Sequence, residues 1–178
     1  MKKTVAVIGS RGAIGNAVVD TLLADESVET VFKFSRAENT EHEDKVKHMF
    51  IDIEDEESIK QATESLPEDT KFDLIFVATG ILHDEKNVFP EKSIKDISFD
   101  KLIKVLTINT IGPTLVGKYF IPYLRKDSKS TFAFLSARVG SISDNKLGGW
   151  YSYRASKTAL NQIISCLLYT SPSPRDPE

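Results

Sequence analysis

The chain has few of the residues that build disulfide and metal frameworks. Its 178 residues include one cysteine, Cys166, which excludes a disulfide framework. The three histidines, His42, His48 and His83, show no metal-ligand spacing, so we expect no metal site. No apolar run approaches the ~20 residues that a membrane-spanning helix needs. Met1-Lys2-Lys3 leads straight into a strand-like segment rather than a signal peptide, so we expect a cytoplasmic enzyme or binding domain with no membrane partner.

Basic clusters are also lacking. The net charge is −3 at pH 7, and residues 38–69 are rich in aspartate and glutamate. Because phosphate binding needs clustered lysine and arginine, we expect no nucleic-acid partner. A hydrophobic content of 40% over this length is sufficient for one domain with a core.

Short apolar runs alternate with segments of helical periodicity along the chain. The runs predict strands at Thr4–Ile8, Val28–Ser35, Val46–Ile53, Phe72–Ala78 and Thr131–Leu135. The periodicity predicts helices at Ala13–Leu23, Glu56–Ser65, Phe99–Arg125 and Ala155–Leu168, the third kinked at Pro113. This alternation predicts an α/β fold with a doubly wound parallel sheet.

A glycine-rich turn, Gly9-Ser10-Arg11-Gly12-Ala13-Ile14-Gly15, separates the first predicted strand from the first predicted helix. Glycines there allow backbone N–H groups to approach a pyrophosphate, and the helix N-terminus adds partial positive charge. The turn therefore favours dinucleotide binding over a simple connection of strand to helix. The second strand ends in Ser35-Arg36 instead of an acidic residue, which suits a 2′-phosphate and favours NADP(H) over NAD(H). Arg36 as a solvated loop charge is the alternative.

Tyr153 and Lys157 are four residues apart in Tyr-Arg-Ala-Ser-Lys, so they share one face of a predicted helix. An ammonium beside a phenol lowers the phenol's pKa, and we expect Tyr153 to act as a proton donor near neutral pH.

The order of these features resembles the short-chain dehydrogenase/reductase family. The glycine turn, Asp52, Ala78-Thr79-Gly80, Asn109, Ser136 and the Tyr153/Lys157 pair follow in that family's order. Residues 136–157 are similar to the branch of C-factor-like signalling proteins and sniffer-type carbonyl reductases. The resemblance covers residues 4–165.

The resemblance implies an oxidoreductase that interconverts a carbonyl and an alcohol on a small molecule. Tyr153 would be the general acid or base, Lys157 would hold the nicotinamide ribose, Asn109 would support a proton-relay water, and Ser136 would be the catalytic serine. The implied cofactor-binding residues are Gly9, Ser10, Arg11, Gly12, Ile14, Gly15, Ser35, Arg36, Asp52, Ile53, Ala78, Thr79 and Gly80, with Tyr153 and Lys157. The alternatives are a non-catalytic nucleotide-binding signalling protein and an epimerase- or dehydratase-type relative.

The sequence departs from the family pattern at several places. Ala13 stands where the short-chain pattern has glycine, and we expect its small side chain to keep helix and strand close. The family's catalytic serine normally stands three residues before a glycine, and relative to Gly140 that position is Ala137. Either the loop shifts to present Ser136, or Ser141 or Ser143 supplies the hydroxyl, or the carbonyl is oriented less well, and of these we favour Ser136.

The residues at the C-terminal end do not continue the alternation of strands and helices. Residues 166–178 look like one reading frame of a sequencing-library transposon adapter, and we interpret them as a non-native tail after a domain at 1–165. The C-terminal strands of the family would then be missing from this chain. We expect the full-length form of the protein to be a homo-oligomer.

Overall fold

A computed structural model describes residues 2–37, 44–84 and 88–170. The chain divides into two compact units. One comprises Met1–Thr79 and Leu115–Leu135, and the other comprises Gly80–Thr114 and Ser136–Glu178. His42 and the end of the predicted tail, residues 171–178, lie outside the described residues. Within the described ranges, no helix combines the length and apolar character that crossing a membrane requires.

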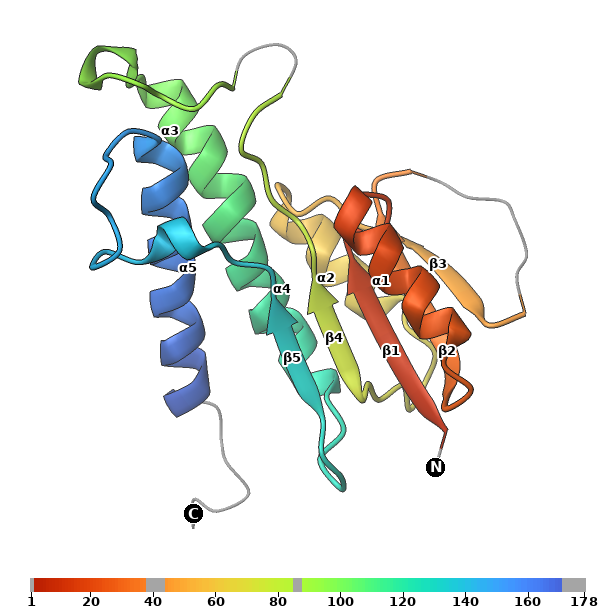
Figure 1. Cartoon of the computed structure of the whole chain (residues 1–178). Coiled ribbons are helices and arrows are strands. Elements are labelled where there is room, and N and C mark those ends of the chain that lie inside the picture. Colours follow the sequence, from red (N-terminus) through yellow and green to blue (C-terminus); the bar gives the residue numbers. More distant parts are fainter. Residues whose placement is uncertain (1, 38–43, 85–87, 171–178) are drawn as a thin grey trace. The chain divides into compact units, whose positions relative to one another are not determined.

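The first unit is built on a parallel sheet of five strands in the order β3-β2-β1-β4-β5 (Figure 1). The strands are β1 (Lys3–Ile8), β2 (Val28–Ser35), β3 (Val46–Phe50), β4 (Leu74–Val77) and β5 (Thr131–Phe134). All five predicted strands are present, and the predicted parallel α/β sheet is confirmed. Strands β3 and β4 are shorter than predicted, so Asp52, Ile53, Ala78 and Thr79 belong to the turns that follow them.

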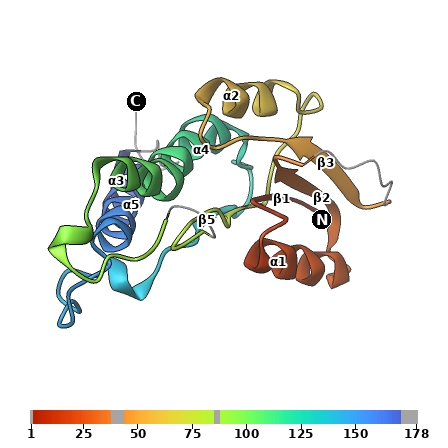
Figure 2. The same ribbon diagram turned by 90° about the horizontal axis from the view of Figure 1, so that it is seen from above.

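Helices cover both faces of this sheet, as a doubly wound fold requires. Successive strand residues point to opposite faces. Val5 and Val7 of β1 pack with Val19 of α1 (Ala13–Ala24). Ala6 and Ile8 face the opposite way, toward α2 (Glu56–Glu64) (Figure 2).

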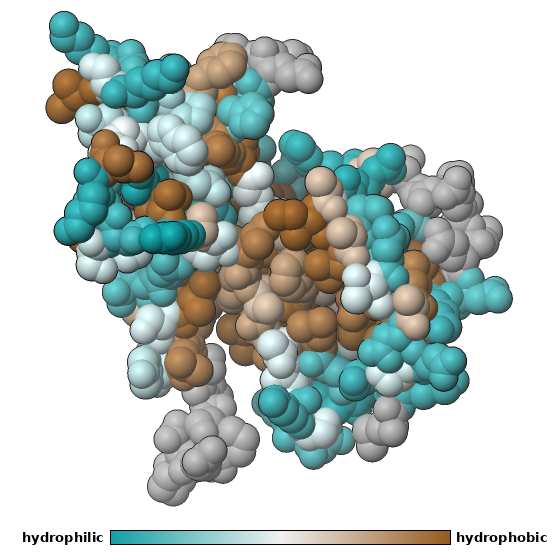
Figure 3. Space-filling model, in the orientation of Figure 1, coloured by the Kyte–Doolittle hydropathy of each residue, from teal (hydrophilic) through white to brown (hydrophobic). Residues whose placement is uncertain are grey.

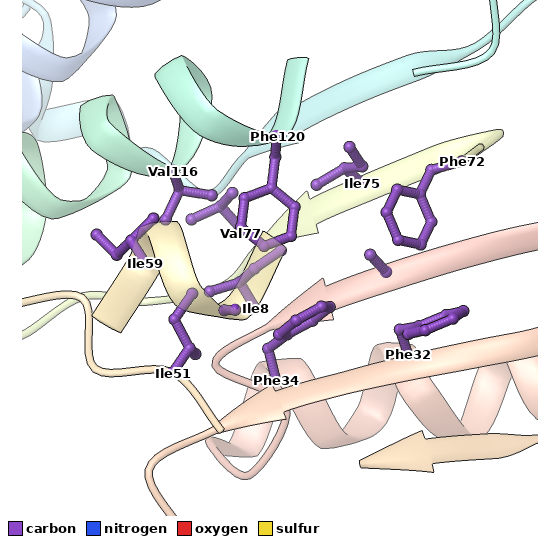
Figure 4. Close-up of a cluster of buried hydrophobic side chains, with 12 residues drawn as sticks. Ile8, Phe32, Phe34, Ile51, Ile59, Phe72, Ile75, Val77, Val116 and Phe120 are labelled. Atoms are coloured by element: carbon purple, nitrogen blue, oxygen red, sulfur yellow. The ribbon is translucent and has the colours of Figure 1, made fainter. Parts of the chain in front are cut away.

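The buried side chains form two hydrophobic clusters, one on each face of the sheet. The larger cluster, on the face covered by α2, contains four buried phenylalanines among aliphatic side chains (Figure 4). Phe34 meets Phe120 of α4 (Gly112–Phe120) edge-to-face, with ring centroids 5.2 Å apart, and Phe32 meets Phe72 at 5.3 Å. Such pairs contribute roughly 1 kcal/mol each beyond their buried area. Apolar residues also gather on the surface over β4 and β5 (Figure 3).

The second unit contains the remaining helical elements. They are the 3-10 turns η1 (Ile94–Asp96) and η4 (Arg138–Gly140), the helices α3 (Phe99–Leu106) and α5 (Tyr151–Thr170), and the π-helical turn η2 (Thr107–Ile111). The chain then passes through α4 to the 3-10 turn η3 (Ile121–Tyr123) in the first unit.

Two predicted helices differ from the observed ones. The helix predicted over Phe99–Arg125 with a kink at Pro113 is divided into α3 and α4 by the π-helical turn η2, which directly precedes Gly112, and α4 ends at Phe120 instead of Arg125. Pro113 has no N–H for the carbonyl of Asn109, so the regular hydrogen-bond ladder cannot continue there. The last helix begins at Tyr151, four residues before the predicted start, and this places Tyr153 inside it. It runs to Thr170, past the predicted start of the non-native tail at Cys166.

Candidate functional site

The glycine turn of the first unit has no room for larger side chains at two positions. Gly9 has φ +83°, and a Cβ there would lie 2.9 Å from Cγ2 of Thr79. A Cβ on Gly15 would lie 2.2 Å from the carbonyl oxygen of Gly9. Gly15 therefore sets the close approach of α1 to the strand end. Ala13 is exposed and does not separate α1 from the strand end, so the close approach depends on Gly15.

The N-terminus of α1 is suited to an anion. Gly12 is the N-cap, and no side chain among the described residues caps it. The side chains of Arg11 and Ile14 are exposed there, whereas the hydroxyl of Ser10 is buried and donates to the carbonyl of Phe34 at 3.2 Å. Uncapped N–H groups at a helix start, with no acidic residue in its first turn, favour phosphate.

The hydroxyl of Thr79, beside Gly9, is buried and has no hydrogen-bond partner among the described residues. A buried hydroxyl without a partner is costly, and a ligand atom at this position would relieve that cost. The backbone of Ala78 pairs with Ile8, which fixes the turn that carries Thr79. These observations fit the predicted dinucleotide.

The residues predicted to select the cofactor lie at the ends of β2 and β3. The guanidinium of Arg36 is 3.7 Å from the carboxylate of Glu54, and the hydroxyl of Ser35 donates to the carbonyl of Ala37. The carboxylate of Asp52 accepts the N–H of Glu54 at 3.0 Å, and Ile53 packs against the larger cluster. The side chain of Arg36 is 69% exposed and therefore accessible to a ligand anion.

The second unit brings Tyr153, Lys157, Asn109 and Gly80 together. Tyr153 and Lys157 are one turn apart on α5, with Nζ of Lys157 5.9 Å from the centroid of the Tyr153 ring. Lys157 is only 2% exposed. A Cβ on Gly80 would lie 3.2 Å from Nζ of Lys157 and 3.3 Å from Oδ1 of Asn109. Gly80 thus packs closely against the lysine and the asparagine, and a side chain at this position would crowd both of them.

The buried side chain of Asn109 joins three segments. Its Oδ1 accepts the N–H of Ile81 at 2.7 Å, and its Nδ2 donates to the carbonyl of Ile81 at 2.9 Å and to Oγ of Ser156 at 3.0 Å. The neighbouring hydroxyl of Thr110 donates to the carbonyl of Ser156 at 2.8 Å. Both amide hydrogens of Asn109 therefore have protein partners, and the side chain holds α5 against the π-helical turn.

The expectation of a lowered tyrosine pKa is wrong for this structure. Burial raises the pKa of Tyr153 above its usual value, and burial lowers the pKa of Lys157. Removal from water disfavours the charged form of each group. The phenol of Tyr153 is consequently protonated at neutral pH.

Ser136 lies in the loop after β5, and its hydroxyl donates to Oδ1 of Asn161 on α5 at 2.6 Å. The two alternative serines, Ser141 and Ser143, have their hydroxyl oxygens 3.2 Å apart. An open depression of about 490 Å³ lies beside them, lined by Gly140, Ile142, Ser143, Thr158, Asn161 and Gln162. Ser136 is thus linked to the helix of Tyr153 by a hydrogen bond.

Four residues that the sequence did not single out contribute to this arrangement, namely Ser156, Thr110, Asn161 and Glu91. Their partners lie 25 to 61 positions away in the sequence. No local motif marks such contacts.

The parallel sheet with its order β3-β2-β1-β4-β5, and the glycine turn after β1, define a Rossmann-type α/β protein. A family model described as short chain dehydrogenase matches residues 3–170, and the chain belongs to this family. The predicted family is therefore confirmed, whereas the C-factor-like branch and the truncation stay predictions.

Two curated relatives each match part of this chain. A 1-hydroxy-2-glutathionyl-2-methyl-3-butene dehydrogenase of Rhodococcus sp. (strain AD45) is 30% identical over 114 residues, which are 64% of this chain and 46% of that protein. The C-signal protein of Myxococcus xanthus is 35% identical over 72 residues, 40% of this chain and 43% of that protein. The chain thus matches about half the length of these relatives.

Solved structures share the fold over nearly the whole chain. A carbonyl reductase from chicken fatty liver with bound NADPH has a TM-score of 0.77 at 26% identity, covering 93% of this chain and 70% of that one. A structure described as the putative carbonyl reductase Sniffer of Caenorhabditis elegans has a TM-score of 0.82 at 19% identity, covering 95% and 80%.

Proposed function

We propose that the protein is an NAD(P)(H)-dependent oxidoreductase that interconverts a carbonyl and an alcohol on a small molecule. The observation that carries the proposal is the buried Lys157 one helical turn from Tyr153, with Gly80 packed closely against Nζ of the lysine. Burying the charged side chain of a lysine is costly. A role in proton transfer would explain why Lys157 is buried beside Tyr153.

In this proposal Tyr153 donates the proton. Its raised pKa keeps the phenol protonated at neutral pH, so Oη can give a proton to a carbonyl oxygen as the carbonyl becomes an alcohol. The ammonium of Lys157 would stabilise the phenolate that remains, and the hydroxyl of Ser136 would orient the carbonyl oxygen. The cofactor supplies the hydride when bound. Asn109 holds α5 against the π-helical turn, and in this proposal it would also support a water molecule of a proton relay.

The glycine turn, the start of α1 and Thr79 would hold the dinucleotide, with Ala78, Asp52 and Ile53 beside its adenosine. We favour NADP(H), because Ser35 and the exposed Arg36 suit a 2′-phosphate. The chicken carbonyl reductase described with NADPH supports this preference.

The test is NADPH oxidation, followed at 340 nm, with a panel of aldehydes and ketones. Tyr153→Phe removes the proton donor and is expected to lower kcat at least about 100-fold. Tyr151→Phe is the matched control, because Tyr151 precedes Ala155 rather than a lysine at the fourth position. Turnover that survives Tyr153→Phe, or that is lost equally in both variants, would contradict the proposed role.

A non-catalytic nucleotide-binding protein with a signalling role is the second candidate, favoured by the match to C-signal. Its signature would be NADPH binding, measured by calorimetry, without turnover of any carbonyl in the panel. The two candidates therefore differ in turnover and not in binding.

A further inference from the structure

One buried carboxylate has no part in the proposed chemistry. Glu91 is 3% exposed and belongs to the segment of the chain that connects β4 to η1. Its carboxylate accepts the N–H of Ser152 at 3.3 Å and the hydroxyl of the same serine. Its carbonyl oxygen accepts the N–H of Trp150 at 2.6 Å. Burying a carboxylate is costly unless it is hydrogen-bonded, and Ser152 supplies two such bonds to Glu91.

These bonds fix an unusual turn. Gly148, Gly149 and Trp150 have φ values of +65°, +66° and +52°, three successive residues in the left-handed region. The last is unfavourable for a tryptophan, and surrounding contacts must hold it. Two contacts are the bond from Trp150 to Glu91 and the bond from Nε of Arg154 to the carbonyl of Gly149 at 3.1 Å.

The same carboxylate completes the start of α5. Ser152 is the second residue of this helix, so its N–H has no acceptor within the helix. The first turn of α5 contains no acidic residue of its own. A negative charge at a helix N-terminus is stabilising, and Glu91 supplies it from 61 positions away.

We infer that Glu91 is a positioning residue that fixes the start of α5 and with it the place of Tyr153. Tyr153 directly follows Ser152, and the Trp150 ring meets the Tyr153 ring edge-to-face at 6.4 Å. A turn held at Trp150 and Ser152 restricts where the phenol lies. The consequence for catalysis rests on the proposed function, whereas the hold on the turn does not.

The experiment compares Glu91→Ala with Glu91→Gln, which keeps the shape and one acceptor oxygen. We expect Glu91→Ala to lower kcat about tenfold or more, because displacing a reacting group by a fraction of an ångström has a large effect, with the KM for NADPH within about twofold of wild type. Glu91→Gln should recover much of the loss. Glu68→Gln, the same change at an exposed glutamate, should have no effect.

Trp150 is the single tryptophan of the chain, so its fluorescence reports the turn without any turnover. Glu91→Ala should shift its emission to longer wavelength at temperatures where the protein is folded. Should Glu91→Ala fail to fold, Ser152→Ala removes one bond to Glu91 and is expected to show the same effects, though smaller.

Unchanged Trp150 emission in a folded Glu91→Ala protein would overturn the inference. So would a loss of activity that follows only the unfolded fraction, without the split between kcat and KM. If the wild type itself turns over no carbonyl, the proposed function fails, and the emission shift alone still decides whether Glu91 holds the turn.

Discussion

Nδ2 of Asn109 donates to Oγ of Ser156 at 3.0 Å, and Ser156 immediately precedes Lys157. The π-helical turn and the helix of Tyr153 and Lys157 are joined by this contact and by the bond from Thr110 to the carbonyl of Ser156.

Asn109→Asp should therefore destabilise the protein. A carboxylate cannot donate to the Ile81 carbonyl or to Ser156, and burying it without donors of its own leaves unsatisfied groups. We expect a loss of about 3 kcal/mol in the free energy of unfolding, measured by urea denaturation. Asn145→Asp is the control, since this exposed residue keeps its role as acceptor for Gly148. Equal stability of the two variants would contradict the importance of the Asn109 bonds.

The glycine turn offers a pair of substitutions with opposite expectations. Gly15→Ala places a Cβ 2.2 Å from the Gly9 carbonyl, and overpacking of this kind should cost about 3 kcal/mol of stability. At Gly12 the nearest atom would be at 3.5 Å, an ordinary contact, so Gly12→Ala should leave the unfolding midpoint unchanged. Its Cβ would instead face the proposed pyrophosphate and weaken NADPH binding about tenfold. Calorimetric titration checks the binding, and equal effects of both variants on stability would contradict the geometry.

The three candidate serines can be separated by kinetics. Ser136→Ala should lower kcat about 100-fold, because it removes the proposed hydrogen-bond donor to the carbonyl oxygen of the substrate. Ser143→Ala should retain wild-type activity, since its hydroxyl is exposed and paired with Ser141. A larger loss in Ser141→Ala than in Ser136→Ala would transfer the role to Ser141.

Cofactor preference provides a test at Arg36. Arg36→Ala should weaken NADPH binding about tenfold and leave NADH binding unchanged, because only NADPH carries the 2′-phosphate. Glu54→Gln should act in the opposite direction, since it removes the carboxylate 3.7 Å from Arg36. Identical changes for both cofactors would show that Arg36 does not read the 2′-phosphate.

Stability at alkaline pH should depend on the buried Lys157 and the partly buried Tyr153. Burial lowers the pKa of Lys157 from its usual 10.5, so between the lowered pKa and 10.5 the unfolded chain binds more protons and stability rises with pH. Burial raises the pKa of Tyr153 above 10.0, so its contribution is full below pH 10 and is lost as pH rises through the folded pKa.

Urea denaturation between about pH 7 and about pH 11 compares wild type with two variants. Lys157→Met should remove the rise, and Tyr153→Phe should remove the fall. Each unit of pKa difference corresponds to about 1.4 kcal/mol. Parallel curves for all three proteins would contradict both shifts.

The five strands, the parallel α/β class, the glycine turn and the spacing of Tyr153 and Lys157 could all be predicted from the amino-acid sequence. These depend on local periodicity, on backbone conformations open to glycine, and on the rise of one helical turn, all of which are properties of short segments. The family resemblance rests on the same short motifs and is confirmed over residues 3–170.

The contacts that hold the candidate site together became apparent only in the folded chain. The bonds from Asn109 to Ile81 and Ser156, and from Glu91 to Ser152, join residues 28 to 61 positions apart, so they follow from packing and not from any local pattern. The pKa directions were also decided there. Proximity of a lysine and a tyrosine was readable from the sequence, but burial opposes both charges, and burial exists only once the chain has folded.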